Sequence, residues 1–261
     1  MDYGNSSPAE VRRLIREGVI TGQTSGMCEG RVQANLVILP KDLAYDFLLF
    51  CQRNPRPCPL LEVSDEGSRG LKIIAKDVDI ATDIPKYRLY KNGELSGEYP
   101  DVREFWRPDF VSFLIGCSFS FETELLAADI PVRHIEEGKN VPMYDTDIPC
   151  ESAGIFHGNM VVSMRPIPYD LAPKAALITG AMPKVHGAPI HIGAPEVIGI
   201  KDLSRPDYGD AVTIRDGEVP VFWPCGVTPQ NAVMRSKPPV AITHAPGHML
   251  IADVKNSSLK Y

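Results

Sequence analysis

The chain has 261 residues, of which 44% are hydrophobic and 23% charged, and its formal net charge is -6. This is the composition of a globular protein, and the scattered basic residues give no electrostatic footprint for nucleic acid or an anionic membrane. The longest nearly apolar stretch, FVSFLIGCSFSF, is too short to cross a bilayer, and the N-terminal residues lack the apolar core of a signal peptide. We therefore expect a cytoplasmic protein that binds neither nucleic acid nor membrane.

The first elements are marked by capping residues and prolines. Ser7-Pro8-Ala9-Glu10 is a capping box, which predicts a helix from about Pro8 to Glu17 that stops at Gly18. ANLVILP is a buried strand closed by Pro40, and Asp42 then caps a helix that continues until Asn54.

Strand patterns dominate the later sequence. KIIAKDVDIATDIP predicts short strands, and KYRLYKNGELSGEY predicts a hairpin around Asn92-Gly93. RPDFVSFLIGCSFSFETELLAADIP has the form strand, small-residue turn, helix. GIFHGNMVVSMRPIP and KAALITGAMP predict two further strands, and PPVAITHAPGHMLIADV predicts a final strand pair broken by a Pro-Gly turn. Strands interleaved with helices indicate an α/β fold.

Four histidines lie in two segments rich in proline and glycine. TGAMPKVHGAPIHIGAPEVIGI holds His186 and His191 on a stiff backbone, where they either reach one pocket or only satisfy backbone carbonyls. THAPGHM holds His244 and His248, but its Pro-Gly pair excludes the helix that a zinc site with this spacing requires. The six cysteines show no CxxC pair and are expected to be reduced, mostly buried thiols. The sequence therefore predicts no metal site.

Other polar candidates stand at strand ends and in turns. Cys117 and Ser118 lie where a strand is followed by a helix, so the backbone amides there can hold a carboxylate and lower the pKa of Cys117. The pattern nevertheless favours a small buried cysteine that fills space under the helix over a nucleophile. Arg133 and Asn140 belong to the mixed-charge segment PVRHIEEGKNVPMY, in which His134 or Glu136 can exchange a proton or the whole run is a solvated loop. Three more candidates adjoin apolar strands: Arg165, Gln33 and Asn35.

Segments from the whole chain resemble one family. They include TGQTSG, VQANLVILP, FLLFCQRNPRPCP, WRPDFVSFLIGCSFSFE, IPVRHIEEGKNVPMY, VHGAPIHIGAPEVIGI and ITHAPGHMLIADV. In this order they resemble the D-glutamate cyclase family, whose bacterial members are catalogued as hydro-lyases. The resemblance implies an α/β fold, a three-layer α/β sandwich with a smaller two-layer α/β subdomain. It also implies the cyclisation of D-glutamate to 5-oxo-D-proline with loss of water and without an organic cofactor. We expect residues 1–125 and 201–261 to form the main domain and residues 126–200 an inserted subdomain.

The cyclisation assigns trial roles to the candidate residues. A base, oxyanion donors and a general acid are needed, and two carboxylates must be oriented. We hypothesise that Arg165 or Arg133 pairs with the α-carboxylate and that Ser118 and its turn receive the reacting carboxyl. His186 and His244 would carry protons, with Cys117 as a further catalytic candidate. The pocket would be shaped by the remaining candidates: Gln33, Asn35, Asn140, His191 and His248.

Two alternatives remain at this point. A dehydratase would use the same pocket to remove a proton beside a carboxylate and expel a β-hydroxyl from a small hydroxy acid. A non-catalytic binder would hold a small dicarboxylate or amino acid without turning it over. Each of the three interpretations expects a small carboxylate or amino acid as the partner, and the sequence leaves homo-oligomer formation open.

Overall fold

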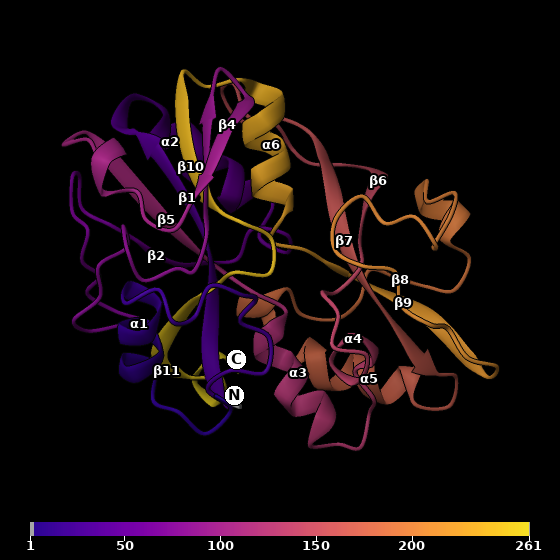
Figure 1. Ribbon diagram of the computed structural model, residues 1–261. Helices are drawn as coiled ribbons and strands as arrows, with labels where there is room; N and C mark the ends of the chain where they lie inside the picture. The colour runs from indigo at the N-terminus through magenta and orange to yellow at the C-terminus, as the bar shows by residue number, and fades with distance from the viewer. Residues whose placement is uncertain (1–2, 261) are drawn as a thin grey trace.

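A computed structural model, which describes residues 3–260, shows two antiparallel β-sheets with helices against and between them (Figure 1). The α-helices are α1 (Pro8–Arg16), α2 (Lys41–Arg53), α3 (Phe119–Leu126), α4 (Arg133–Glu136), α5 (Ala172–Gly180) and α6 (Thr228–Ser236). The strands are β1 (Arg31–Pro40), β2 (Leu60–Val63), β3 (Tyr87–Lys91), β4 (Glu94–Tyr99), β5 (Phe110–Gly116), β6 (Met143–Pro149), β7 (Asn159–Pro168), β8 (His191–Ile192), β9 (Glu218–Pro224), β10 (Val240–His244) and β11 (Leu250–Lys255).

The larger sheet is organised around β1. Its strand order is β2-β5-β1-β10-β3-β4, and β11 also pairs with β1. On one side β1 pairs with β5 from Ala34↔Gly116 to Pro40↔Phe110. On its other side β10 and β11 follow each other along its length. Both edges of β1 are therefore paired, which makes it a central strand of the sheet, and nine of its ten residues are buried.

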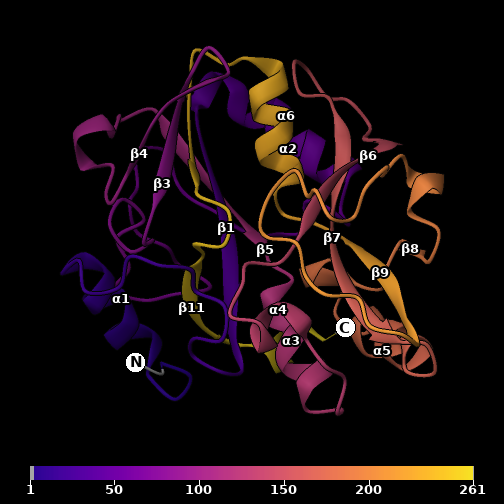
Figure 2. The ribbon, with the colours of Figure 1, turned by 45° about the vertical axis from the view of Figure 1, so that its right-hand side comes forward.

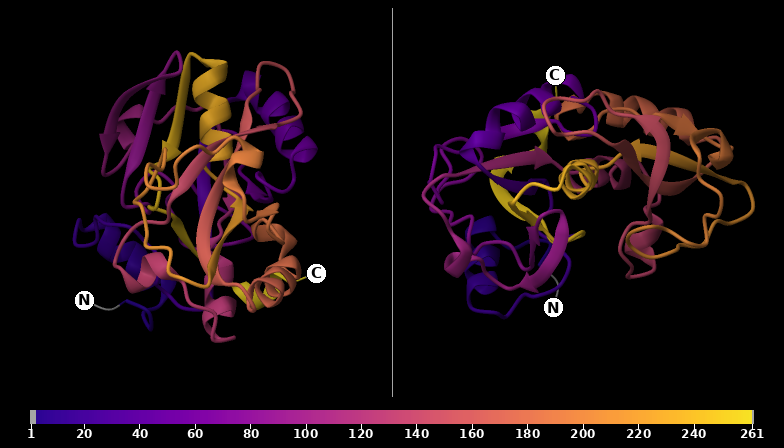
Figure 3. Two further views of the ribbon diagram at one scale, coloured as in Figure 1. Left: turned by 90° about the vertical axis from the view of Figure 1, so that its right-hand side faces the viewer. Right: turned by 90° about the horizontal axis from the view of Figure 1, so that it is seen from above.

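The smaller sheet has the order β6-β7-β9-β8. Its longest pairing joins β7 to β9, from Val162↔Pro224 to Pro168↔Glu218. The two sheets occupy opposite halves of the molecule in the view from above (Figure 3).

Two helices cross between the sheets. Helix α3 follows β5 and packs against β1 of the larger sheet, and it also reaches the smaller sheet, where the Phe121 ring lies 5.6 Å from the Trp223 ring of β9. Helix α6 follows β9 of the smaller sheet, and its Val233 belongs to the same buried cluster as Phe113 of β5. Figure 3 shows α6 almost end-on between the two halves, and Figure 2 shows α3 and α6 as separate helices. Both helices thus have contacts with both sheets.

Several predicted elements are confirmed. Helix α1 begins at Pro8, and the Ser7 side chain accepts a hydrogen bond from the Glu10 amide at 3.2 Å. Helix α2 ends before Asn54, although Pro40 rather than Asp42 is its N-cap. The β3-β4 hairpin turns at Asn92-Gly93. Both residues have positive φ, as a two-residue type I′ turn requires. The β5-α3 connection and the two final strands β10 and β11 are also found, although each of these strands pairs with β1 and not with the other.

The predicted strands in KIIAKDVDIATDIP are wrong, because this segment is made of turns. Three of its backbone amides donate hydrogen bonds to a side chain and not to a neighbouring strand. The buried carboxylate of Glu62 accepts hydrogen bonds from the amides of Lys72, Ile73 and Ile74 at 2.5 to 3.1 Å. The apolar residues that suggested strands, such as Ile80 and Ile84, anchor the loop in the main core.

The predicted strand in KAALITGAMP is also wrong, because residues Ala172–Gly180 form α5. Proline stands at the start of this helix, where its missing amide hydrogen is not needed. Its β-branched residues suggested a strand, but Ala175 and Thr179 recur at helical spacing and are both buried. The Thr179 hydroxyl accepts a hydrogen bond from Nε1 of Trp223 at 3.0 Å, which fixes the helix against β9.

The α/β class is confirmed as a mixture of helices and antiparallel sheets. The strands of the smaller sheet lie between Met143 and Pro224, while the boundary between two domains stays a prediction. Among residues 3–260, no helix is long and apolar enough to span a membrane.

Candidate functional site

One cavity of about 560 Å³ adjoins the buried polar groups between the sheets. Its walls come from the glycine-rich loop before β1, the start of β1, helix α3 and the end of α4. The lining residues are Tyr3, Ser25, Gly26, Met27, Cys28, Glu29, Arg31, Gln33, Phe119, Glu122, Thr123, Leu126, Ala127 and Ile135. The cavity is thus mostly apolar on its α3 side and polar on its β1 side, a common combination in small-molecule sites.

Glu122 is the buried carboxylate of this cavity. Its Oε1 lies 3.0 Å from Nε of Arg165, is also bound by Nη2 of that arginine, and lies 3.3 Å from Nε2 of His134. Its Oε2 has no hydrogen-bond partner among residues 3–260. Desolvation raises the pKa of the Glu122 carboxyl, but the nearby His134 and Arg165 outweigh this effect and hold that pKa below its usual range. Glu122 is therefore an ionised carboxylate with one oxygen fixed and one available.

Arg165 is held on all sides. Its Nη1 donates to Ser163 and its Nη2 to Ser118, both at 3.0 Å. The guanidinium also lies over the rings of Phe121 and Trp223, at 5.1 and 5.6 Å from their centres. Because the side chain is fully buried and its donors are used inside the protein, Arg165 fixes Glu122 rather than offering a free cation to substrate.

His134 lies behind the cavity wall. Its ring is buried and stacks on Phe119, a cavity residue, at a centroid distance of 6.1 Å. Its Nε2 is within ion-pair distance of Glu122 but is not aligned for a hydrogen bond. His134 is therefore a close neighbour of Glu122 without a hydrogen bond to it.

Gln33 pins the glycine-rich loop. Its Oε1 accepts from the Thr24 hydroxyl at 2.7 Å, and its Nε2 donates to the Thr24 carbonyl at 2.9 Å. The Thr24 amide in turn donates to the Gly247 carbonyl. Gln33 lines the cavity, but its side-chain oxygen and nitrogen are hydrogen-bonded within the loop.

Asn35 joins the two strand-to-helix turns. Its Nδ2 donates to the carbonyl of Gly116 at 2.8 Å, at the end of β5. On the other side, a Cβ added to Gly226 would lie 2.0 Å from that same nitrogen. Only glycine fits there, so Asn35 has a structural use between the turns that precede α3 and α6.

Arg133 and Asn140 lie near His134 along the chain but do not line the cavity. The Arg133 guanidinium is buried and bound by Glu218, with Glu136 at 3.2 Å. The backbone amide of Asn140 donates a hydrogen bond to the Asp210 carboxylate at 2.9 Å, and the Asn140 side chain packs against the turn at Gly247. Like Arg165, Arg133 is already paired with a protein carboxylate.

Cys117 lies in the turn before α3 and is buried among the apolar residues of a small cluster. Burial raises the pKa of its thiol, which is the opposite of the lowering expected from the helix N-terminus. Its neighbour in the second turn, Cys225, also has a raised pKa, about 11, because of desolvation. All six cysteines are buried and free, as the sequence predicted.

The four histidines of the Pro/Gly segments lie outside this cavity. His186 is buried with φ of 82°, its Nδ1 lies 2.8 Å from the Arg56 carbonyl, and burial lowers its pKa to about 4. His244 is buried on β10, where Nδ1 accepts from the Leu36 amide at 3.0 Å, and burial lowers its pKa to about 3. His191 and His248 contact backbone carbonyls at 2.7 and 3.0 Å. Each ring thus meets backbone groups, the plainer of the two sequence interpretations.

The structure adds two residues that the sequence interpretation did not place in the site, Glu122 and Arg31. Glu122 is one of two glutamates in the segment FSFETELL and the buried one of the two, and an ionisable group on such an apolar helix is a signal for a buried partner. Arg31 begins β1 after a glycine and carries no such signal. Among residues 3–260, no group of three or more His, Cys, Asp and Glu side chains is arranged to hold a metal ion.

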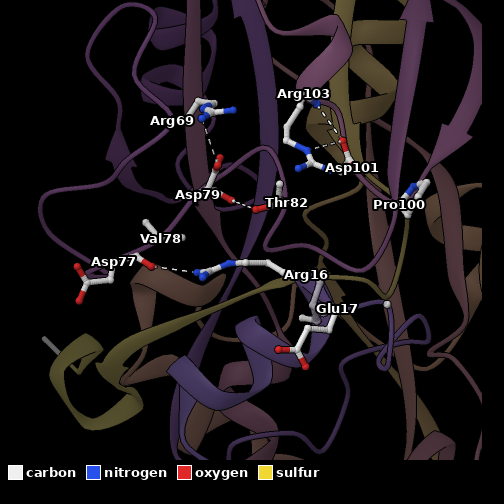
Figure 4. A pocket seen from close by; sticks show the side chains of 12 residues that line it. Arg16, Glu17, Arg69, Asp77, Val78, Asp79, Thr82, Pro100, Asp101 and Arg103 are labelled. Carbon is white, nitrogen blue, oxygen red and sulfur yellow. Dashed lines mark hydrogen bonds and ion pairs between the residues drawn. The ribbon is translucent and has the colours of Figure 1, made fainter.

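A second cavity, of about 590 Å³, lies beside α1 and two loops at residues 69–82 and 100–103 (Figure 4). Its charges pair with one another: Arg103 binds Asp101 through two nitrogens, at 3.1 and 2.9 Å, and Arg69 lies 3.5 Å from Asp79. None of the sequence candidates lines it. We assign it no function.

Comparison of the sequence with known proteins shows the family of this chain. A protein of Clostridium beijerinckii named "putative hydro-lyase" is 70% identical over all of both chains. Proteins with the same description from Bacillus subtilis and Psychrobacter arcticus are 61% and 59% identical, over 97% and 99% of this chain and 98% of each relative. A crystal structure of a nitrogen repressor-like protein from Methanococcus jannaschii covers 98% of both chains at 10% identity, with a TM-score of 0.42 that is too low to define the fold. The family model described as D-glutamate cyclase matches residues 111–253, which include Glu122, His134 and Arg165. The chain belongs to the D-glutamate cyclase family.

Proposed function

We propose that the protein is a hydro-lyase that closes D-glutamate to 5-oxo-D-proline with release of water. The family membership and the names of the relatives support the reaction class. The structural observation that carries the proposal is Glu122, a buried carboxylate that lines the cavity, with one oxygen bound by Arg165 and the other without a hydrogen-bond partner among residues 3–260.

The reaction requires a group that moves protons without leaving the site. The substrate nitrogen forms a bond to the γ-carboxyl carbon and gives up two protons. One carbon–oxygen bond of that carboxyl breaks, and the oxygen leaves with both protons as water. A side chain that first accepts and then donates a proton serves both steps.

Glu122 fits this task by position and charge. As an ionised group it attracts the substrate ammonium, and its free Oε2 can accept a proton from the nitrogen and return it to the leaving oxygen. His134, 3.3 Å from Oε1, can hold the proton between the two steps. Arg165 keeps the carboxylate in place, since its guanidinium is itself fixed by Ser118 and Ser163.

This proposal moves the proton-transfer role from His186 and His244 to Glu122. Both histidines are buried away from the cavity and pair with backbone groups. Their lowered pKa values keep them neutral at physiological pH. Substitution of either histidine is therefore expected to alter stability more than turnover.

The test is to incubate the purified protein with D-glutamate, L-glutamate and a panel of small hydroxy acids and to follow products by mass spectrometry. Formation of 5-oxoproline from D-glutamate is the expected result. Loss of water from a hydroxy acid alone would support the dehydratase alternative. Binding of D-glutamate without any loss of water would support a binding protein instead.

A further inference from the structure

Arg31 is a cavity arginine that forms no ion pair with a carboxylate of residues 3–260, although its charge helps to lower the pKa of Asp253. Its Nη1 donates to the backbone carbonyl of Asp253 on β11 at 2.5 Å. Among residues 3–260, no carboxylate lies within 4.0 Å of its guanidinium. The buried arginines differ in this respect, because Arg12, Arg133 and Arg165 are each paired with a protein carboxylate.

The backbone holds Arg31 in place. Its amide donates to the Cys28 carbonyl at 3.0 Å, at the end of the glycine-rich loop. The pairing of β1 with β11 shifts register between Arg31 and Gln33, and irregularities of this kind re-aim side chains. Both residues line the cavity, so a fixed strand end rather than a free loop presents the guanidinium.

The cavity lining therefore holds a cation, Arg31, and a buried anion, Glu122, that are not paired with each other, while its other carboxylate, Glu29, is exposed. Arg31 comes from β1 and Glu122 from α3, and no ion pair joins them in the described part of the chain. An α-amino acid in its zwitterionic form carries the complementary pair of charges.

We propose that Arg31 is the specificity residue that binds the α-carboxylate of the substrate, while the free oxygen of Glu122 receives the ammonium group. This inference rests on the proposed function, because it places the spectator carboxylate of D-glutamate on Arg31 and leaves the γ-carboxyl free to react. A guanidinium can bind a carboxylate through two parallel hydrogen bonds, which fixes orientation as well as affinity. It also replaces Arg165 and Arg133, whose guanidinium groups are already bound by Glu122 and Glu218.

The test compares two ligands that differ only in the α-carboxylate, D-glutamate and 4-aminobutanoate. Calorimetry with the full chain measures the affinity of each for the wild type, for Arg31→Met and for Arg31→Lys. Arg31→Met is expected to weaken D-glutamate binding by about 10- to 100-fold, the range of a lost charge-assisted contact, and to leave 4-aminobutanoate binding unchanged. Arg31→Lys should recover part of the loss. Arg13→Met is the matched control, since Arg13 is an exposed arginine outside the cavity.

Turnover separates this inference from the proposed function. If D-glutamate is converted, Arg31→Met should raise KM for D-glutamate by the same factor with little change in kcat. Equal weakening of both ligands, or D-glutamate binding as in the wild type, would overturn the assignment of Arg31 and leave the dehydration standing. Binding that depends on Arg31 without any turnover would support the assignment and contradict the dehydration. Failure of the wild type to bind D-glutamate would overturn both.

Discussion

Arg165 on β7 reaches α3 and places its Nε 3.0 Å from Oε1 of Glu122. The pair is almost fully buried, and it joins the smaller sheet to the helix that follows the larger sheet. Because only one carboxylate oxygen is used, the same contact that ties the two halves together leaves the other oxygen available to the cavity. Structural and chemical roles are thus combined in one side chain.

Removal of Arg165 should destabilise the protein strongly. Arg165→Met leaves the Glu122 charge buried without its partner, which costs about 3–5 kcal/mol. The double variant Glu122→Gln/Arg165→Met removes both charges and should recover much of that loss, although not turnover. Urea unfolding of the two single variants and the double variant measures the coupling. Additive losses would contradict a direct pairing of the two groups.

The buried histidines should make stability fall in acid. Burial lowers the pKa of His244 from 6.5 to about 3. Between these two pH values the His244 ring is protonated in the unfolded chain but stays neutral in the folded protein. Folding stability from this group is complete above pH 6.5 and is lost as the pH falls toward 3, by about 1.4 kcal/mol per pH unit.

His244→Gln should therefore reduce the slope of unfolding free energy against pH between 6.5 and 4. Denaturant titrations at several pH values measure that slope, with the exposed His157→Gln as the control. An unchanged slope in His244→Gln would show that this ring is not neutral in the folded protein.

The turn before α6 should not tolerate a side chain. In Gly226→Ala the new Cβ would lie 2.0 Å from Nδ2 of Asn35, so the variant should lose about 1–3 kcal/mol of stability. Gly22→Ala is the matched control, because no atom lies within 4 Å of its added Cβ. Thermal unfolding compares the two, and the Gly226→Ala/Asn35→Ala double variant should be less destabilised than the sum of its parts.

Cys117→Ala should retain turnover. Burial raises the pKa of the thiol, so the group stays protonated at neutral pH and is a poor nucleophile. Initial rates of product formation, with melting temperature as a check on folding, test this expectation. Loss of turnover in a stably folded Cys117→Ala protein would show that the thiol has a role in catalysis.

Capping residues, turn residues and apolar runs were enough to predict α1, α2, the β3-β4 hairpin and the β5-α3 connection. These elements depend on local chemistry, as the Ser7 cap and the Asn92-Gly93 turn illustrate. The errors occurred in segments whose secondary structure depends on contacts with residues distant in the sequence. The amides of residues 72–74 bind Glu62, and Thr179 of α5 accepts a hydrogen bond from Trp223, and neither contact can be read from local sequence.

The same reasoning explains the candidate site. The sequence singled out Ser118, Arg165 and Gln33 as polar candidates, but their hydrogen-bond partners became known only with the structure. Arginine beside an apolar strand indicates a paired charge or a ligand, and the sequence cannot say which. Because Arg165 is paired with Glu122, we consider Arg31, which forms no ion pair among residues 3–260, as the group that binds the substrate carboxylate.

The central claim is that Glu122 carries protons in a dehydration, and a single comparison tests it most directly. Wild type, Glu122→Gln and Glu124→Gln are incubated with D-glutamate, 5-oxoproline is measured over time by mass spectrometry, and circular dichroism verifies folding. Glu124 lies on the same helix and pairs with Lys260 at 2.6 Å outside the cavity, so its variant controls for loss of a charge. We predict a loss of about 100-fold or more in Glu122→Gln and normal rates in Glu124→Gln. Wild-type rates in a folded Glu122→Gln protein would contradict the account.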